Sequence, residues 1–345
     1  MTPRTAPVTA TPRPKIADVA AAAGVSVPTV SKVLNGRTHV SDATRARVQQ
    51  ALEELDYSKR AAAPAQPGFL QLVVNNFDSP WVLETMAGVE AAADRLGYAV
   101  AYARAEHTTA ERWRKLREPS VNRLDGVLLL APRKGSRLVT MVRALKIPAV
   151  AIDPEGTEGL AVPSVSPASF SGALAAVSHL LGQGHRRIGI ITGRKHSAGH
   201  GRARYAAYAA ALHEAGLPVL PELVQDGDFS IESGMRLGGE LLDLPQPPTA
   251  IFTGSDLQAL GVMNAAAQRS LRVPQDLSIV GFDDIAQAAL TSPPLTTVRQ
   301  PLAQLASMAV GMLTEQQDQP ASGTPTALEV ATELVVRGTT AAPQP

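Results

Sequence analysis

The chain has 345 residues, of which 45% are hydrophobic and 18% are charged, and it contains no cysteine. This length and composition allow two ordinary domain cores and a small additional module, and they exclude disordered, collagen-like and disulfide-stapled proteins. The net charge of +1 argues against a uniformly basic nucleic-acid coat or a polybasic membrane anchor, but residues 1–67 carry nine basic and five acidic side chains. This local excess indicates a separable module at the N-terminus that binds a polyanion.

The first 13 residues are rich in proline and threonine and predict a disordered tail. They lack the apolar segment of a secretory signal, and no run in the chain approaches the roughly 20 apolar residues of a membrane helix. We therefore expect a cytoplasmic protein that does not bind a membrane.

Residues 14–60 predict three short helices. The first spans about residues 16–23 and ends at Gly24, where a glycine favours the left-handed conformation that closes a helix. Ser26 and Ser41 are placed to cap the second and third helices, and the third is expected to run to about Tyr57. The apolar positions that recur at helical spacing are Ile16, Val19, Ala20, Ala23, Val30, Val33, Leu34, Val48, Leu52 and Leu55.

A helix, a tight glycine turn and a capped second helix together indicate a helix-turn-helix DNA-binding domain. The first two turns of the second helix are expected to enter the major groove, while short polar side chains bind phosphates. Asn35 is equally consistent with a helix C-cap, and His39 with a solvated loop residue. The residues that we expect to contact DNA are Ser26, Val27, Pro28, Thr29, Ser31, Lys32, Asn35 and His39.

Residues 61–68 contain two prolines and predict a linker or hinge, and residues 69–338 predict a body followed by a short tail, 339–345. In the body, apolar runs alternate with helical patterns, which is typical of parallel sheets covered on both faces. Its size favours two α/β subdomains with a cleft between them. The expected strands are 69–74, 99–103, 126–130, 149–152, 188–191, 250–253 and 277–282, and the expected helices lie near 82–96, 137–145, 168–182, 202–215, 231–243, 256–269 and 302–315.

The N-terminal motifs resemble those of the lactose-repressor (LacI/GalR) family of transcriptional regulators. They are Lys15-Ile16-Ala17-Asp18-Val19-Ala20, Ala23-Gly24-Val25-Ser26, Thr29-Val30-Ser31-Lys32-Val33-Leu34-Asn35-Gly36, Val40-Ser41 and Thr44-Arg45. The resemblance continues through residues 69–338, for example at Gly281-Phe282-Asp283-Asp284. It implies a body with the periplasmic-binding-protein-like fold, which holds a small molecule, most often a sugar, between its subdomains.

Candidate effector-binding residues follow from this resemblance and from the chemistry of a polyhydroxyl ligand. Such a ligand needs hydrogen-bond acceptors for its hydroxyl groups, a forked donor such as a guanidinium, and a flat apolar wall for its C–H face. Asp153 and Asp283 follow apolar strands, where ligand clefts form. Trp81 could instead pack in the core or a dimer, and Asp256 could cap its helix. The expected set is Asn76, Trp81, Asp153, Arg204, Phe229, Ser255 and Asp283, in which Ser255 replaces the usual asparagine.

Two departures from the family pattern concern the DNA contact. Lys32 stands where the family usually has arginine, and lysine lacks the rigid bidentate fork that reads guanine, so base discrimination should be weaker. The stretch from Ser58 to Gly68 is about two residues shorter than the family pattern, and it contains Pro64 and Pro67. Gln66 stands near the position of the leucine that relatives wedge into the minor groove, so a hinge helix on DNA is not assured.

We find no catalytic constellation, no metal-ligand spacing and no cofactor loop. Gly182-Gln183-Gly184 follows a helix and precedes a strand, the reverse of the order that a dinucleotide loop requires. A solute-binding transport protein would share the body but not the cationic module, and a Rossmann-type enzyme would need a glycine loop after a strand. A non-enzymatic function is therefore expected, with no cofactor.

The sequence thus predicts a transcriptional regulator, in the simplest case a repressor, whose operator affinity is controlled by a small molecule, most often a sugar. One helix-turn-helix domain reads one half-site, so we expect a homodimer on a pseudo-palindromic double-stranded operator. The helix near 82–96 is expected to contribute to the dimer interface. The end of the chain shows no heptad run, so a tetramer is not expected.

Overall fold

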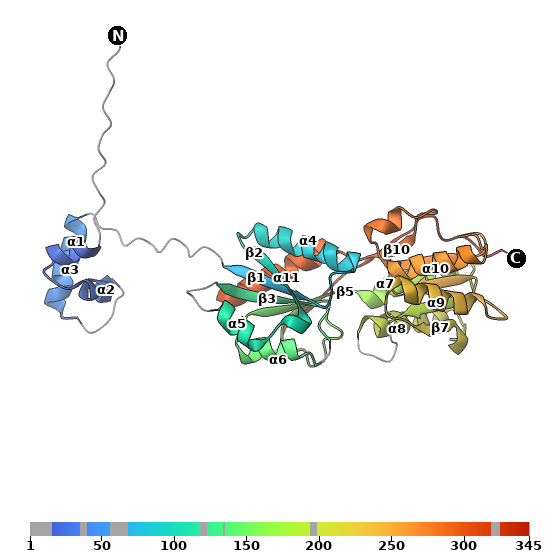
Figure 1. Ribbon diagram of the computed structural model, residues 1–345, viewed down its shortest axis with the longest axis horizontal. Coiled ribbons are helices and arrows are strands. Elements are labelled where there is room, and N and C mark those ends of the chain that lie inside the picture. The colour runs from blue at the N-terminus through green and yellow to red at the C-terminus, as the bar shows by residue number, and fades with distance from the viewer. Residues whose placement is uncertain are drawn as a thin grey trace, which may run out of the picture. The chain divides into compact units, whose positions relative to one another are not determined.

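Figure 1 shows a computed structural model that describes residues 16–34, 40–55, 68–117, 123–133, 135–193, 199–318 and 325–344. The chain divides into two compact units, Met1–Gln66 and Pro67–Pro345, which we call the headpiece and the body. The predicted tail at 1–13 and the predicted linker, apart from Gly68, lie outside the described residues.

The headpiece consists of α1 (Ile16–Ala22), α2 (Val27–Leu34) and α3 (Asp42–Glu54). Gly24 adopts the predicted left-handed conformation, with φ of 63°, and the Ser41 hydroxyl accepts a hydrogen bond from the Thr44 amide at 3.3 Å. Helix α3 is capped at Leu55, two residues before the predicted end. The side chains buried where the helices meet are Val19, Ala20, Ala23, Val30, Val33, Val48 and Ala51. The three-helix prediction is therefore confirmed.

The first subdomain of the body is built on a parallel sheet with strand order β11-β5-β4-β3-β1-β2. One face packs against α4 and α11 and the other against α5 and α6, which explains why its strands are continuous apolar runs. The strands are β1 (Phe69–Val74), β2 (Ala99–Arg104), β3 (Leu124–Leu130), β4 (Ala149–Ile152), β5 (Ser164–Pro167) and β11 (Ala327–Val330). The helices are α4 (Pro80–Asp94), α5 (Ala110–Leu116), α6 (Arg137–Ala144) and α11 (Leu302–Asp318).

The second subdomain repeats this architecture around a sheet of order β12-β10-β9-β8-β6-β7, in which only the β10–β12 pairing is antiparallel among the described strands. Helices α7 and α8 cover one face, and α9 and α10 cover the other. The strands are β6 (Ile188–Thr192), β7 (Val224–Asp226), β8 (Ala250–Thr253), β9 (Ser278–Asp283), β10 (Thr296–Arg299) and β12 (Glu333–Val335). The helices are α7 (Ser169–Gly182), α8 (His200–Glu214), α9 (Ile231–Leu242) and α10 (Asp256–Gln268).

The backbone passes between the subdomains after β5, after β10 and between β11 and β12 (Figure 1). Neighbouring crossings are tied together, because the Ala168 amide donates to the Val330 carbonyl at 2.8 Å. The Thr332 hydroxyl also donates to the Ala168 carbonyl at 3.3 Å. These crossings form the hinge about which the two subdomains can close.

The structure contains several elements that the sequence pattern did not predict, namely α5, β5, β7, β10, β11 and β12. They are short, and strands such as Thr296–Arg299 carry polar residues that are buried only because partner strands lie on both sides. Trp113 on α5 is fully buried, and its indole N–H donates to Gln71 at 2.6 Å. That pairing joins residues far apart in the chain, which local patterning does not detect.

The C-terminal end of the body corrects the predicted boundary at residue 338. Thr339, predicted to begin a tail, is fully buried: its hydroxyl donates to the Ile279 carbonyl at 2.7 Å and accepts from the Thr296 amide at 2.9 Å. Ala341 follows with hydrogen bonds to the Ser278 hydroxyl. These residues close the edge of β9 and β10, whose backbone groups would otherwise be buried without partners.

Replacing Thr339 with valine should therefore destabilise the body. The substitution keeps the volume but leaves the buried Thr296 amide without a partner, which costs about 1–3 kcal/mol. Urea unfolding followed by circular dichroism measures this cost. Thr326→Val, at an exposed position in the same C-terminal region, is the matched control and should change the stability by less than about 0.5 kcal/mol. Equal stability of the two variants would show that residue 339 does belong to a tail.

Candidate functional site

A cavity of about 200 Å³ lies between the two subdomains of the body, at the carboxyl ends of their strands. Asp153 follows β4 of the first sheet, whereas Asp283 ends β9 and Ser255 follows β8 of the second. This is where α/β folds place their ligands. We call this cavity the cleft, and the side chains that line it include Asn75, Ser79, Trp81, Arg133, Asp153, Glu155, His200, Arg204, Phe229, Ser255, Leu257, Asp283 and Gln300.

The structure brings together Trp81, Asp153, Arg204, Phe229, Ser255 and Asp283, as the sequence predicted. The remaining candidate, Asn76, is exposed and does not line the cleft; the preceding residue, Asn75, lines it instead. Asn75 donates its side-chain amide to the Ala131 carbonyl at 3.2 Å. Successive side chains of an extended segment point to opposite sides, so an error of one residue exchanges the inward for the outward position.

Arg204, on α8, is the buried cation of the cleft and is only 4% exposed. Its guanidinium donates a hydrogen bond to the Gly254 carbonyl and lies 3.8 Å from the Phe282 ring centroid. Burial lowers the pKa of Arg204, while the carboxylates of Asp283, Asp153 and Asp256 oppose that shift. The Nε atom of Arg204 has no hydrogen-bond partner among the described residues. A buried donor without a partner is the position where a ligand oxygen would be held.

Asp153 and His200 form an ion pair across the cleft, with 3.3 Å between Asp153 Oδ1 and His200 Nδ1. Asp153 lies in the first subdomain and His200 begins α8 in the second. Burial raises the pKa of the Asp153 carboxyl, and the neighbouring His200 and Arg204 partly offset this shift. The other ring nitrogen, His200 Nε2, is buried without a partner in the described part of the chain. The pair therefore links the two subdomains and leaves His200 Nε2 available to bind a ligand.

A second polar connection joins Trp81, Gln300 and Asp283. The Trp81 indole N–H donates to Gln300 Oε1 at 3.2 Å, and Gln300 Nε2 donates to Asp283 Oδ1 at 2.6 Å. Burial raises the pKa of Asp283 well above its usual value; Arg204 acts against this shift, while Asp256 adds to it. Trp81 also packs against the core of the first subdomain. The two alternatives offered for it, packing in the core and lining the cleft, therefore both apply.

Phe229 forms the apolar wall of the cleft, in a left-handed conformation with φ of 67°. The Ser255 hydroxyl donates to the Phe229 carbonyl at 3.0 Å and accepts from the Gln258 amide at 3.2 Å. Ser255 therefore caps α10 and holds Phe229 in place, and this leaves its hydroxyl little capacity to bind a ligand. The ring rests on Gly193, where a β-carbon would approach it to 2.5 Å.

Asp256 does not line the cleft, nor does it cap α10, because Ser255 does so. Its buried carboxylate accepts a hydrogen bond from the Ile285 amide at 2.9 Å and another from the Thr297 hydroxyl. Burial raises the pKa of Asp256 to about 6. These bonds fix the loop after β9 and the neighbouring strand β10. Asp283 is the last residue of β9, so Asp256 supports the position of a cleft residue without reaching the cleft itself.

The sequence analysis did not name several of the cleft residues, namely Asn75, Ser79, Arg133, Glu155, His200, Leu257 and Gln300. His200 lies four residues before Arg204, which places both on one face of α8, and this spacing could have revealed it. Gln300 follows β10, which was not predicted, so no sequence signal placed it at a strand end. The cleft position of Gln300 depends on a crossing of the chain between subdomains.

In the headpiece, α2 presents most of the predicted DNA-contacting side chains to solvent. Ser26, Val27, Pro28 and Lys32 are exposed, whereas Ser31 is half-buried. Thr29 is also half-buried, and its hydroxyl lies 2.9 Å from that of Ser26. The remaining candidates, Asn35 and His39, lie outside the described residues. Exposed side chains on the first two turns, with a lysine among them, are the surface that a recognition helix offers to a groove.

The described residues contain neither a metal-binding cluster nor a membrane-spanning helix. They contain no group of three or more His, Cys, Asp or Glu side chains arranged to hold a metal ion. None of the helices in the described ranges combines the length and apolar character needed to cross a bilayer.

Comparisons with known proteins agree with this architecture. Residues 15–59 match the lacI family of bacterial regulatory proteins, and residues 177–340 match the periplasmic binding protein-like domain. The chain is 35% identical to the HTH-type transcriptional repressor CytR of Escherichia coli (strain K12) over 332 residues, which cover 94% of this chain and 96% of CytR.

The chain is also similar in fold to two solved structures of transcriptional regulators. A complex of the transcriptional regulator CelR with cellobiose has a TM-score of 0.71 and 32% identity, covering 95% of this chain and 100% of CelR. A lac repressor dimer bound to operator and the anti-inducer ONPF has a TM-score of 0.68 and 29% identity, covering 96% and 100%.

The fold and the two sites define a regulator with a helix-turn-helix headpiece and a ligand-binding body. The chain belongs to the LacI family of bacterial regulatory proteins. The predicted resemblance and the predicted fold class are thereby confirmed, since the body has the periplasmic-binding-protein-like fold.

Asp283→Asn should stabilise the body at pH 7. A pKa raised in the folded state means that the folded chain disfavours the charged carboxylate relative to the unfolded chain, and this balance already includes the attraction of Arg204. The gain is about 1.4 kcal/mol for each unit between the usual pKa of 3.8 and either the raised pKa or pH 7, whichever is lower. It should shrink as the pH falls toward the usual value of 3.8, because the carboxyl is then protonated in both states.

Urea midpoints at several pH values between about 4 and 7 test this expectation. Asp94→Asn, at an exposed position of α4 away from the cleft, serves as the control. A pH-independent difference between Asp283→Asn and the unmodified chain would contradict the expected origin of the effect.

Proposed function

We propose that the protein is a repressor that binds a pseudo-palindromic operator as a homodimer and releases it when a small polyhydroxyl molecule, most simply a sugar, occupies the cleft. The observation that carries this proposal is the arrangement around Arg204. A buried fork donor with an unpartnered Nε faces two carboxylates and lies beside Phe229. No single group of this kind indicates a sugar site, but the convergence of these groups supports one.

The chemistry of the cleft supports a sugar as the effector. Hydroxyl groups can donate to Asp153 and Asp283 and accept from Arg204, while the C–H face of a pyranose can stack on Phe229. Carboxylates that are already partly desolvated lose little further hydration when a neutral ligand covers them. The CelR structure, a family relative, holds the disaccharide cellobiose.

Operator binding is supported by the charge and exposure of the headpiece. The excess of basic residues up to residue 67 attracts the phosphate backbone, and α2 presents the exposed Lys32 for base contact. Val27 is 40% exposed, and a thymine methyl is an apolar partner for such a side chain in the major groove. The lac repressor structure, again a relative, is a dimer bound to operator.

Homodimer formation is supported by exposed apolar side chains on the body. Leu83 on α4 is 50% exposed, and Leu290, beyond β9, is 82% exposed. Large apolar side chains exposed to this degree are candidates for burial against a second copy. The headpiece supplies the second reason, because one recognition helix covers only half of an operator.

The proposed coupling uses the polar connections across the cleft. The Asp153–His200 pair and the Trp81–Gln300 hydrogen bond join the subdomains on either side of the ligand position. The Ala286 amide also donates to Glu84 at 3.3 Å. A ligand that binds more tightly to one degree of closure shifts the body toward that state, and operator affinity changes by the difference in binding energy.

The headpiece part of the proposal predicts the effect of Lys32→Met. Loss of a base contact should weaken binding to a selected operator roughly 5- to 150-fold, which corresponds to about 1–3 kcal/mol, and should weaken binding to random duplex much less. Fluorescence anisotropy at one fixed salt concentration measures both affinities. Gln49→Met, at an exposed position of α3, should leave them unchanged. An equal loss of affinity for operator and for random DNA would show that Lys32 contacts a phosphate and not a base.

The cleft part predicts a response to effector that depends on Phe229. A panel of mono- and disaccharides that includes cellobiose is first screened for a rise in melting temperature. The sugar that raises it should then reduce operator affinity roughly 5- to 150-fold in the unmodified chain. Phe229→Ala should abolish the response while retaining operator binding, whereas Val336→Ala, at an exposed site outside the cleft, should retain both. Operator affinity that stays constant at saturating sugar would refute the coupling.

A further inference from the structure

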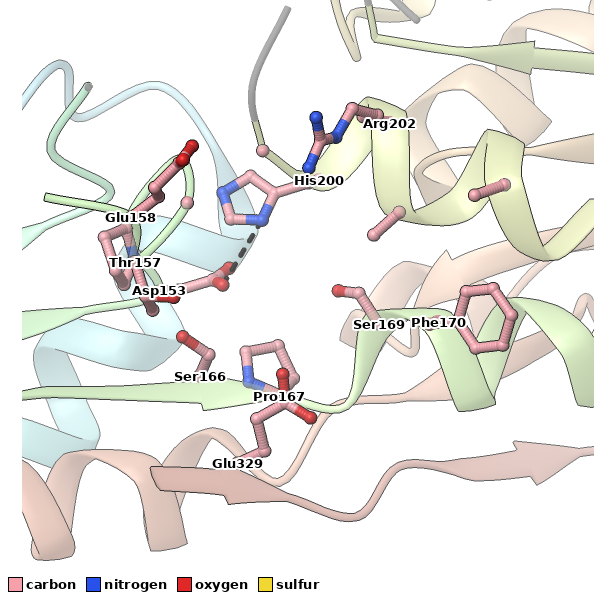
Figure 2. Close-up of a pocket in the computed structure, with 15 residues that line it drawn as sticks. Asp153, Thr157, Glu158, Ser166, Pro167, Ser169, Phe170, His200, Arg202 and Glu329 are labelled. Atoms are coloured by element: carbon pink, nitrogen blue, oxygen red, sulfur yellow. Dashed lines mark ion pairs between the residues drawn. The ribbon is translucent and has the colours of Figure 1, made fainter. Parts of the chain in front are cut away.

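A larger cavity, of about 420 Å³, lies beside the cleft at the hinge (Figure 2). It shares Asp153 and His200 with the cleft, but its remaining lining residues are different. They come from the loop after β4, from the end of β5, from the starts of α7 and α8, and from β11. We call it the hinge cavity.

The wall formed by the second subdomain offers hydrogen-bond donors. Ser169, the first residue of α7, is only 8% exposed, and its hydroxyl has no hydrogen-bond partner among the described residues. Figure 2 shows this hydroxyl pointing away from α7, into the cavity and toward Asp153. No side chain caps the N-terminus of this 14-residue helix. A buried donor without a partner, at the positive end of a helix dipole, favours an anionic group in front of it.

Arg202 adds a positive charge to the same wall. It lines the cavity from α8 and is exposed, so its guanidinium is accessible to a ligand. The N-terminus of α7, the Ser169 hydroxyl and Arg202 all belong to this wall, and each of them can donate hydrogen bonds. Charge-assisted hydrogen bonds to a carboxylate are the strong contacts that such donors make.

The opposite wall, from the first subdomain, offers acceptors. Asp153, Glu158 and Glu329 present carboxylates, and Thr157 and Ser166 present hydroxyls. Figure 2 shows Glu329 beside Pro167, across the cavity from α8. Carboxylates on this wall repel a doubly charged ligand such as phosphate, and they attract hydroxyl or ammonium donors.

We propose that the hinge cavity is a second ligand site, for a small monocarboxylate whose other end carries hydrogen-bond donors, as in a hydroxy acid or an amino acid. The ligand carboxylate lies against Ser169 and the N-terminus of α7, with Arg202 as its counter-ion. Its donors face Asp153 and Glu329.

Occupancy of this site bears on the hinge. Its walls come from both subdomains, and Ser166 and Ser169 flank the crossing at which the chain passes from one to the other. A ligand that contacts both walls binds differently to the open and closed forms and so shifts their populations. Because Asp153 and His200 line both cavities, a ligand in one also changes the polar surroundings of the other.

Isothermal titration calorimetry of the full chain tests the proposal. D-Gluconate probes the hydroxy-acid class and L-serine the amino-acid class, and acetate and inorganic phosphate are the comparison ligands. We expect saturable binding of D-gluconate, L-serine or both, and weaker binding of acetate and phosphate. Whichever probe binds identifies the class. Absence of saturable binding of both, or acetate binding as tightly as they do, overturns the proposal.

Variants locate the bound ligand. Ser169→Ala should weaken binding about tenfold or more, the effect of losing a hydrogen bond to a charged group. The melting temperature without ligand should stay the same or rise, because the substitution removes a buried hydroxyl without a partner. Ser171→Ala, at an exposed position on the same helix outside the cavity, is the matched control.

Ala206→Trp gives an independent test, since Ala206 is an exposed residue on the cavity wall and a tryptophan there fills the space. A melting curve confirms that this variant is folded. Binding should be lost in Ala206→Trp. Binding that survives both Ser169→Ala and Ala206→Trp would place the probe in the cleft or elsewhere and would refute the hinge site.

Discussion

The buried guanidinium of Arg204 is the constraint on which the cleft depends. A cation that is 4% exposed must be compensated, and the carboxylates of Asp283, Asp153 and Asp256 provide this from three different strand ends. The same burial raises the pKa values of these carboxyls, and the charge of Arg204 opposes that rise at Asp153 and Asp283. This balance keeps polar groups together in an otherwise apolar interior, where a hydroxylated ligand can replace water.

The position of this cluster between two subdomains connects binding with movement. The subdomains are joined by backbone crossings and by a few polar contacts, including the Asp153–His200 pair. Contacts of this kind change when the subdomains rotate, whereas the apolar cores on either side remain intact. In the proposed mechanism, a ligand at this junction acts on the relative arrangement of the subdomains. The hinge cavity lies at the same junction, which explains why a second ligand there would act on the same movement.

The headpiece is a separate structural unit with its own small core, centred on Val19, Val30 and Val48. The local pattern predicted it almost completely, because helix periodicity, Gly24 and the Ser41 cap are interactions between near neighbours in the chain. The sheet strands of the body that are fully apolar were predicted for the same reason. Short strands such as β10 were missed, since their polar residues are buried only by partners distant in sequence.

The sequence by itself determined the class of protein, the helix-turn-helix module, the two α/β subdomains and six of the residues that line the cleft. Tertiary structure alone decided that Asn75 and not Asn76 faces the cleft, that Ser255 supports Phe229, that His200 pairs with Asp153, and that Thr339 belongs to the body. The physical reason is that propensity and periodicity act over a few residues. The direction of a side chain at a strand end, and the partner of a buried polar atom, are set by chain crossings between segments more than a hundred residues apart in some cases.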